Sequence, residues 1–459
     1  MTQLDTRPRG ALLRPGDDGY DAGRAAWNRN ARQAPAAVVM ARDPADVVAA
    51  VRLARAEGRG VGVMATGHGT SVPCDGGVLV NTSRMTGVRV DPRTRIARVA
   101  AGTRWADLAP VAAAHGLVGL PGSSSRVGIV GYTSGGGFGW LGRRYGLASG
   151  WVTAADVVTA DGDLVRVDAR RHPELLWGLR GGGGALGIVT TLEFALHPVV
   201  RVHGGNLFYP VERAREVLAA YAAWAAPHPD EMASAVAFRR FPPLPAVPAP
   251  LRGRLVMAVR GCWCGSDLAA GERLVDELRT ALGPPVLDTF GVLPAAHLDP
   301  ISSDPVDPLA AVGHCELVRA LTPEAIDALV ELGADSPLVM LELRRLGGAL
   351  LGPSAQLSPM GRTEARYSLN AIGMTPTPES GAAVRSFLAR LAAAVRPHAT
   401  GGTYLNFLDA DGATPTRVRA AYTPADWQRL VELRRRWDPD DVFRFSRHGR
   451  QRASVGTAR

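Results

Sequence analysis

The sequence contains no lysine, so all 52 of its basic Lys+Arg residues are arginines, set against 43 acidic residues for a formal net charge of +9. A Walker A motif ends in Gly-Lys-Ser/Thr, so the absence of lysine excludes a P-loop nucleotidase. The arginines are dispersed among acidic residues, and even the densest run, 434–436, lies between Glu432 and Asp438. We therefore expect no nucleic-acid-binding surface. With 53 Gly and 34 Pro, the composition is typical of a bacterial genome rich in G and C.

Cysteines and long apolar runs are scarce as well. Four cysteines are too few for a disulfide framework in 459 residues, and a Cys-x-Cys pair has the wrong spacing for a zinc site, so we predict buried thiols and no metal at Cys74, Cys262, Cys264 and Cys315. No stretch approaches the roughly 20 apolar residues of a spanning helix. The first thirty residues are charged and lack the apolar core of a signal peptide. These absences predict a cytoplasmic protein with no membrane partner.

The N-terminal part of the sequence has the alternating pattern of an α+β protein. A strand at 36–40 is followed by a helix that begins after Asp43 with Pro44 at its first position and ends at Gly58. Further strands are expected at 61–64, 78–81, 88–90, 95–101 and 188–196, a helix at 105–114, and a hairpin over 157–167 with an Asp161-Gly162 turn.

Three loops in this part are rich in glycine, at 65–71, 127–139 and 180–187. None fits a dinucleotide-binding fingerprint, in which Gly-x-Gly-x-x-Gly opens a helix inside a tight β-α-β unit. One such loop alone most often provides flexibility. Three loops between residues 65 and 187 indicate instead that the backbone closely approaches a bulky, flat ligand that carries phosphate.

After about residue 203 the pattern changes to long amphipathic helices that alternate with strands. The helices are expected at 211–226, 268–282, 324–332 and 382–395, and the strands at 255–259, 338–343 and 367–372. The proline-rich segment 241–250 is expected to be an exposed loop or lid. Near the C-terminus we expect a strand at 403–408 and a helix at 425–437.

Together these motifs resemble the berberine-bridge-enzyme-like FAD-linked oxidases of the vanillyl-alcohol-oxidase type. The matching runs are Arg14-Pro-Gly-Asp-Asp-Gly-Tyr20, Gly67-His68-Gly69, Cys74-Asp-Gly-Gly77, Leu120-Pro-Gly122, Gly135-Gly-Gly-Phe-Gly139, Val158-Thr-Ala-Asp-Gly162, Arg180-Gly-Gly-Gly-Gly184, Tyr404-Leu-Asn406 and Trp437-Asp-Pro-Asp-Asp-Val-Phe443. The resemblance implies an α+β fold: a PCMH-type FAD-binding lobe of two subdomains at 1–202, a substrate lobe at 203–400 with an antiparallel sheet backed by helices, and a C-terminal segment at 401–459 that returns to the FAD lobe.

The resemblance also implies FAD as the cofactor, attached covalently through His68 alone. His68 matches the histidine that bonds to the flavin 8α-methyl group, and a neutral imidazole is a competent nucleophile near pH 7. Many relatives form a second bond through a cysteine at the position of Ser124, and serine cannot form that thioether. The full set of implied cofactor residues is His68, Thr66, Gly67, Gly69, Thr70, Gly122, Ser123, Ser124, Gly128, Gly131, Tyr132, Gly187, Ile188 and Asn406.

For catalysis the resemblance points to Tyr404, which matches a tyrosine that takes the substrate's proton as hydride leaves for flavin N5. A phenol, with a pKa of about 10, needs a lowered pKa or a proton relay for this task. Tyr367 is a candidate partner from the substrate lobe, and an ordinary core tyrosine is an equal interpretation. Candidates to line the substrate pocket are His314, Glu316, Glu342 and Arg344.

The resulting prediction is an FAD-dependent oxidase that transfers hydride from an alcohol or amine-type C–H to the flavin, with O2 as acceptor and H2O2 as product. The expected substrate is a bulky secondary-metabolite intermediate, as in antibiotic biosynthesis. Two alternatives stay open. One is a flavin-dependent cyclase or monooxygenase-like enzyme that uses a flavin–oxygen adduct or no net redox change. The other is a protein that binds flavin or a metabolite without turnover. The oligomeric state also stays open.

Overall fold

The structure, a computed structural model, describes residues 8–352, 358–360 and 364–449. Its first sheet consists of β1 (Ala11–Leu13), β2 (Ala37–Met40), β3 (Val61–Met64) and β4 (Val78–Asn81). The strands lie in the order β1-β2-β4-β3, with β2, β4 and β3 parallel and β1 antiparallel. Helix α2 (Pro44–Ala56) forms where it was predicted because the Asp43 side chain accepts a hydrogen bond from the N–H of Asp46 and caps the helix.

A second sheet, antiparallel throughout, follows in the order β5-β6-β9-β7-β8: β5 (Val88–Asp91), β6 (Ile96–Ala100), β7 (Val152–Val158), β8 (Leu164–Asp168) and β9 (Ile188–Ala195). The expected hairpin joins β7 to β8, and Gly162 adopts φ +78° in its turn. Helices α3 (Trp105–Ala113) and α6 (Pro173–Leu179) pack on this sheet. We call these two sheets with their helices the N-terminal lobe.

The third sheet has eight strands and forms the core of a central lobe. All neighbouring strands are antiparallel, in the order β13-β10-β12-β11-β16-β17-β15 with β14 also paired to β10. Their bounds are β10 (Arg201–Pro210), β11 (Met232–Arg240), β12 (Leu255–Trp263), β13 (Leu287–Asp288), β14 (Gly291–Pro294), β15 (Ala311–Val318), β16 (Met340–Arg345) and β17 (Tyr367–Met374).

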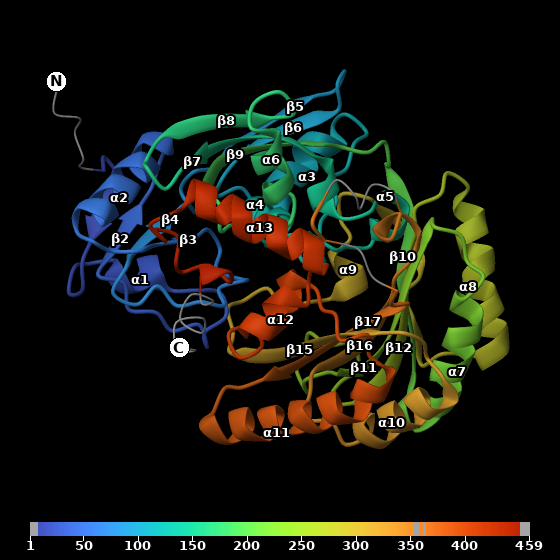
Figure 1. Cartoon of the computed structure of the whole chain (residues 1–459). Coiled ribbons are helices and arrows are strands. Elements are labelled where there is room, and N and C mark those ends of the chain that lie inside the picture. Colours follow the sequence, from blue (N-terminus) through green and yellow to red (C-terminus); the bar gives the residue numbers. More distant parts are fainter. Residues whose placement is uncertain (1–7, 353–357, 361–363, 450–459) are drawn as a thin grey trace.

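Four amphipathic helices cover the face of this sheet that lies away from the N-terminal lobe (Figure 1): α7 (Ala214–Ala225), α8 (Leu268–Leu282), α10 (Pro323–Gly333) and α11 (Pro378–Val395). Side chains such as Val217, Leu278, Leu329 and Phe387 fill the core between helices and sheet. The other face of the sheet is turned towards the N-terminal lobe, and the functional site lies on that side.

The C-terminal segment returns to the N-terminal lobe through α12 (Pro415–Arg419) and α13 (Pro424–Trp437), and α13 packs against α6. The N–H of Val61 donates to the oxygen of Val442 at 2.7 Å, which ties the segment to β3. The prediction of a strand at 403–408 is wrong. The main chain closes there into a 3-10 turn at Leu405–Phe407, in which the N–H of Phe407 donates to the oxygen of Tyr404 at 3.0 Å.

The three sheets and their helices confirm the α+β class. The four cysteines are buried free thiols. No helix within the described ranges is long and apolar enough to cross a membrane.

Candidate active site

Two cavities meet between the lobes. The glycine-loop cavity, of about 360 Å³, is lined by residues of the loops at 64–72, 122–138 and 183–189 and by the C-terminal residues Phe443, Phe445, Ser446 and Arg447. The sheet cavity, of about 1240 Å³, lies against the central sheet and the loop at 241–253. Both cavities are bordered by His68, Asp304, Asn370 and Asn406. The two cavities therefore adjoin where loops of the N-terminal lobe and the C-terminal segment meet the central sheet.

The structure brings most of the predicted cofactor residues to the glycine-loop cavity. Two members of the predicted set lie elsewhere: Ser124 borders the sheet cavity, and Ile188 is buried in the core of the N-terminal lobe. The residues that line the glycine-loop cavity are Thr66, Gly67, His68, Gly69, Thr70, Gly122, Ser123, Gly128, Gly131, Tyr132, Gly187 and Asn406.

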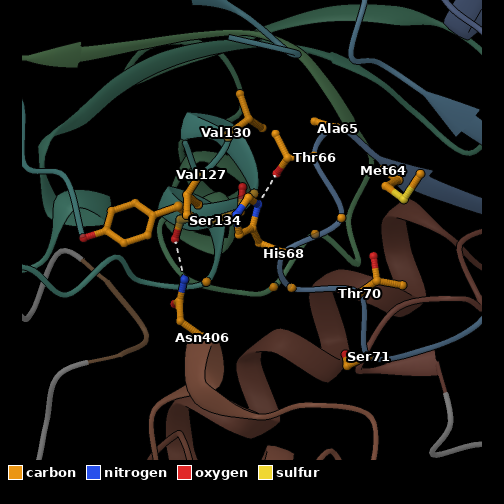
Figure 2. Close-up of a pocket in the computed structure, with 18 of the residues that line it drawn as sticks. Met64, Ala65, Thr66, His68, Thr70, Ser71, Val127, Val130, Ser134 and Asn406 are labelled. Carbon is orange, nitrogen blue, oxygen red and sulfur yellow. Dashed lines mark hydrogen bonds between the residues drawn. The ribbon is translucent and has the colours of Figure 1, made fainter. Parts of the chain in front are cut away.

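His68 is held in a tight turn that only glycine permits. Gly67 has φ +74°, and a Cβ on it would lie 2.6 Å from the Cα of Ala26. Nδ1 of His68 lies 2.9 Å from the hydroxyl of Thr66 (Figure 2), and the imidazole stacks on the indole of Trp27 with ring centroids 4.6 Å apart and planes 16° apart. Burial lowers the pKa of His68 to about 4, so the imidazole is neutral at pH 7.

Side chains of the C-terminal segment close the glycine-loop cavity. The amide nitrogen of Asn406 donates to the main-chain oxygen of Tyr132 at 2.9 Å (Figure 2), and its oxygen accepts from the N–H of Gly137 at 3.4 Å. Nη2 of Arg447 donates to the main-chain oxygen of Gly69 at 3.0 Å. The hydroxyl of Tyr422 donates to the main-chain oxygen of Gly181 at 3.0 Å. All three glycine-rich loops are thus bonded to a segment that lies far away in the sequence.

The lining of the glycine-loop cavity fits a large ligand with phosphate groups. The hydroxyls of Tyr132 and Ser446 and Nε of Arg447 are buried there, and none of them has a hydrogen-bond partner among the described residues. A Cβ on Gly131 or Gly184 would meet no atom within 4 Å, so bare backbone borders open space. Gly131 also belongs to the first turn of α4 (Ile129–Ser134), where backbone N–H groups lack intrahelical acceptors and suit an anion.

Comparison with known proteins agrees with this reading of the cavity. A family described as "FAD binding domain" matches residues 35–168, and "Berberine and berberine like" matches 403–447. The chain is an FAD-dependent oxidoreductase. Both matched segments contribute walls to the glycine-loop cavity, and FAD is its cofactor.

Individual relatives align with almost the whole oxidoreductase. (R)-6-hydroxynicotine oxidase of Paenarthrobacter nicotinovorans is 27% identical over 464 residues, which cover 95% of this chain and 96% of that protein. An FAD-linked oxidoreductase of Dictyostelium discoideum is 25% identical over 445 residues, covering 95% and 93%. The crystal structure of 6-hydroxy-D-nicotine oxidase from Arthrobacter nicotinovorans shares the fold, with a TM-score of 0.84 at 23% identity and coverage of 97% and 99%.

A buried ionic cluster of the oxidoreductase lies on the cavity-facing side of the central sheet. Glu342 accepts a hydrogen bond from Nε of Arg344 at 3.0 Å and is also paired with Arg260. The Arg344 guanidinium lies over the ring of Trp140 at 4.3 Å. Burial opposes the charge of Glu342, but Arg344 and Arg260 together hold its pKa below the usual value. Arg260 and Arg344 border the glycine-loop cavity and share the one carboxylate of Glu342. These three side chains together therefore present a net positive charge to the FAD site.

The two tyrosines predicted to be catalytic do not border either cavity. Tyr404 is only 4% exposed, its ring centroid lies 5.4 Å from that of Phe138, and burial raises its pKa above the usual value. Tyr367 lies in the core beneath α7, with its ring 6.4 Å from that of Tyr221. Side chains alternate between the two faces of a strand. Tyr367 therefore points away from the cavities, and the opposite face of β17, which carries Asn370, borders them.

Of the four side chains expected to line the substrate pocket, Arg344 alone borders one of these two cavities. Glu342 lies behind Arg344 and borders neither cavity. His314 and Glu316 also lie away from the cavities, where they pair with each other at 3.1 Å. Glu316 has a second partner in Arg417, at 2.7 Å. Sequence reasoning missed several lining residues that have no local signal, because only the sheet register and the meeting of loops bring them together: Arg260, Asp304, Met340 and Asn370.

Proposed function

We propose that the protein is an FAD-dependent oxidase of a bulky, largely apolar small molecule with an alcohol or amine-type C–H, a class that includes secondary metabolites. We base this on the junction of the two cavities at His68, where loops that fit FAD adjoin a space of about 1240 Å³. When bound, FAD takes a hydride from such a C–H and passes the electrons to O2, which becomes H2O2. The relative named (R)-6-hydroxynicotine oxidase supports an oxidase.

The lining of the sheet cavity supports the choice of substrate class. The loop after β11 contributes no helix or strand between 241 and 254 and places apolar side chains along the cavity. Burial of a matching apolar surface stabilises a complex by roughly 25 cal/mol per Å², which favours an organic skeleton over a free sugar. The apolar residues on this wall include Phe208, Phe241, Pro243, Val247, Pro248, Leu251 and Leu293.

Within this proposal FAD is attached covalently through His68 alone. The imidazole is neutral, borders the cavity and is restrained by Thr66 and Trp27, which are the conditions that a nitrogen nucleophile needs. Ser124 borders the sheet cavity, and its hydroxyl accepts a hydrogen bond from the N–H of Arg126 at 3.3 Å. A serine at this position gives no second bond to the flavin.

Within this proposal, Tyr404 and Asp304 are the candidates to take the proton that is lost with the hydride. Tyr404 could reach a substrate only after its side chain and that of Phe138 rearrange, because Phe138 packs on its ring and its hydroxyl lies outside the cavities. Asp304 follows α9 (Asp299–Ser302) and borders both cavities, and no hydrogen bond or ion pair joins its carboxylate to the rest of the described chain. The cations Arg239 and Arg260 lie near it. Asp304 therefore has the more direct access to a substrate held at the junction.

Acid precipitation of the purified protein tests the attachment. Flavin fluorescence in the pellet of the wild type, and its loss in His68→Ala, are the expected results. Flavin released to the supernatant by the wild type would contradict the covalent bond while leaving FAD binding intact.

A screen of bulky alcohols and amines for peroxide release and O2 uptake tests the oxidase. We expect one H2O2 for each substrate consumed. Incorporation of an oxygen atom from O2 into the product would favour a monooxygenase-like enzyme. This alternative is supported by 31% identity over 198 residues with an FAD-dependent monooxygenase of Fusarium proliferatum. Conversion without O2 uptake would favour a cyclase, and binding without conversion a sequestering protein.

A further inference from the structure

Residues 27–30 form a segment that joins the two lobes beside His68, and we call it the strap. Its side chains bond to the ends of two strands of the central sheet. Nδ2 of Asn28 donates to the oxygen of Ala311 at 3.0 Å, and Nδ2 of Asn30 donates to the hydroxyl of Thr375 at 2.7 Å. The N–H of Arg29 donates to the oxygen of Leu309 at 2.9 Å. The strap is therefore fixed on the central lobe.

Trp27, the first residue of the strap, faces the N-terminal lobe and stacks on His68. Its ring is nearly parallel to the imidazole, at 16°, with centroids 4.6 Å apart. Such a stack restricts rotation of the imidazole out of its plane. The missing Cβ of Gly67 permits this approach, because that atom would lie 2.8 Å from the backbone nitrogen of Trp27.

The indole acts through its ring face and not through its nitrogen. Nε1 of Trp27 is buried and has no hydrogen-bond partner among the residues that the structure describes. On the ring edge, His68 has a second restraint, since its Nδ1 lies 2.9 Å from the hydroxyl of Thr66. The plane of the imidazole is thus set by Trp27 and its rotation within that plane by Thr66.

We propose that Trp27 is a positioning residue for covalent attachment of FAD, holding the His68 imidazole in the orientation in which its nitrogen meets the 8α-methyl carbon. This inference rests on the proposed attachment through His68. The net step forms one N–C bond, removes one hydrogen from the imidazole and one from the methyl group, and transfers two electrons to O2, which becomes H2O2. Because the strap is bonded to β15 and β17, the attachment depends on the central lobe being in place.

The test compares the acid-stable fraction of flavin with the total flavin in Trp27→Leu, Trp27→Phe and Trp27→Ala. Leucine keeps apolar bulk but removes the stacking face, whereas phenylalanine keeps a face. Orientation contributes large factors to bond formation, so we expect Trp27→Leu to form the bond at least about 10-fold more slowly during incubation with excess FAD. Total bound flavin should stay near the wild-type level, and Trp27→Phe should restore most of the rate.

Trp437→Ala is the matched control. Trp437 is also half-buried, contacts the ring of His172 with centroids 5.1 Å apart, and has a buried Nε1 without a partner within the described part of the chain. It borders neither cavity. We expect wild-type attachment in this variant, measured by flavin fluorescence of the acid pellet and by the mass of the polypeptide.

The possible outcomes are distinct. Equal attachment rates in the wild type, Trp27→Leu and Trp27→Phe would overturn the positioning role. Equal slowing in Trp27→Leu and Trp27→Phe would also overturn it, because the stack would then not matter. If Trp27→Ala does not fold, the leucine variant decides the matter. A wild type without acid-stable flavin would instead refute attachment through His68 itself.

Discussion

The side-chain amide of Asn406 donates a hydrogen bond at 2.9 Å to the main-chain oxygen of Tyr132, which lies 274 residues earlier in the chain. The oxygen of the same amide occupies space next to Gly135, where a Cβ would come within 2.6 Å of it. No side chain fits at Gly135 because a side chain from the C-terminal segment already fills that place.

Replacement of Asn406 by alanine should weaken both the fold and FAD retention. Two hydrogen bonds to the glycine loop are lost, so the free energy of unfolding should fall by about 1–3 kcal/mol. Chemical unfolding and flavin content after gel filtration measure the two effects. Gln428→Ala, which removes an exposed hydrogen bond of 2.9 Å to Glu432, is the control and should change the free energy by less than about 0.5 kcal/mol. Equal losses in both variants would contradict the role of Asn406.

Gly131→Ala should separate folding from cofactor binding. The new Cβ meets no protein atom within 4 Å, and alanine suits the helix α4 better than glycine by up to about 1 kcal/mol, so stability should hold or rise. The methyl group would enter the glycine-loop cavity, and the flavin content should fall severalfold. Gly291→Ala, on β14 and outside both cavities, also meets no atom within 4 Å and should keep its flavin. Full flavin content in Gly131→Ala would show that FAD does not approach α4.

Glu342→Gln should be strongly destabilising. It leaves the buried guanidinium groups of Arg260 and Arg344 without their shared carboxylate, and the loss of one partner of such a group costs about 3–5 kcal/mol. The measurement is urea unfolding of the two proteins side by side. Asp411→Asn, which breaks the exposed pair between Arg385 and Asp411 at 2.7 Å, should cost less than about 1 kcal/mol. A small effect at Glu342 would mean that water or a bound anion already compensates the arginines.

Asp304→Asn and Tyr404→Phe should differ in their effect on turnover. A general base contributes about 10²–10⁴-fold, so we expect kcat to fall by at least about 100-fold when Asp304 is changed. Tyr404→Phe should cost less than about 10-fold, because its hydroxyl borders neither cavity. The substrate found in the peroxide screen provides the assay. The reverse order of losses would assign the proton to Tyr404 and imply that Phe138 moves when substrate binds.

The rate of FAD attachment should be insensitive to pH across the neutral range. Burial lowers the pKa of His68 from 6.5 to about 4, so its imidazole gains a proton only as the pH falls towards 4. Between about pH 5.5 and 8 the nucleophile stays neutral, and time courses of acid-stable flavin should superimpose. A fall in the attachment rate with a midpoint near pH 6.5 would show instead that His68 is hydrated before FAD binds.

Elements with signals inside their own sequence were predicted accurately. The helix α2 begins after Asp43 because a carboxylate and a following proline define a helix start regardless of context. The strand expected at 403–408 is the counterexample. The segment turns instead between the lobes, where ring contacts with Phe138 and the bond from Asn406 to Tyr132 decide its conformation.

The site likewise combines residues that have a local sequence signal with residues that only the fold brings together. The glycine loops and His68 could be recognised because each motif is continuous in the sequence. Arg260 and Glu342 are 82 residues apart and meet only through the pairing of β12, β11 and β16. The stack of Trp27 on His68 likewise depends on two turns that approach each other, and periodicity within either segment carries no information about such a contact.

The closure of the glycine-loop cavity by Arg447 sets an order of events during synthesis. Arg447 bonds to Gly69, which leaves the ribosome 378 residues earlier. At about 5–20 residues per second, the glycine loops wait roughly 20–75 s for the segment that completes their wall. A nascent chain therefore cannot retain FAD by the contacts that the finished protein offers, and a product truncated before this segment would be colourless. Retention of FAD by a translation product would thus report that synthesis has passed Arg447.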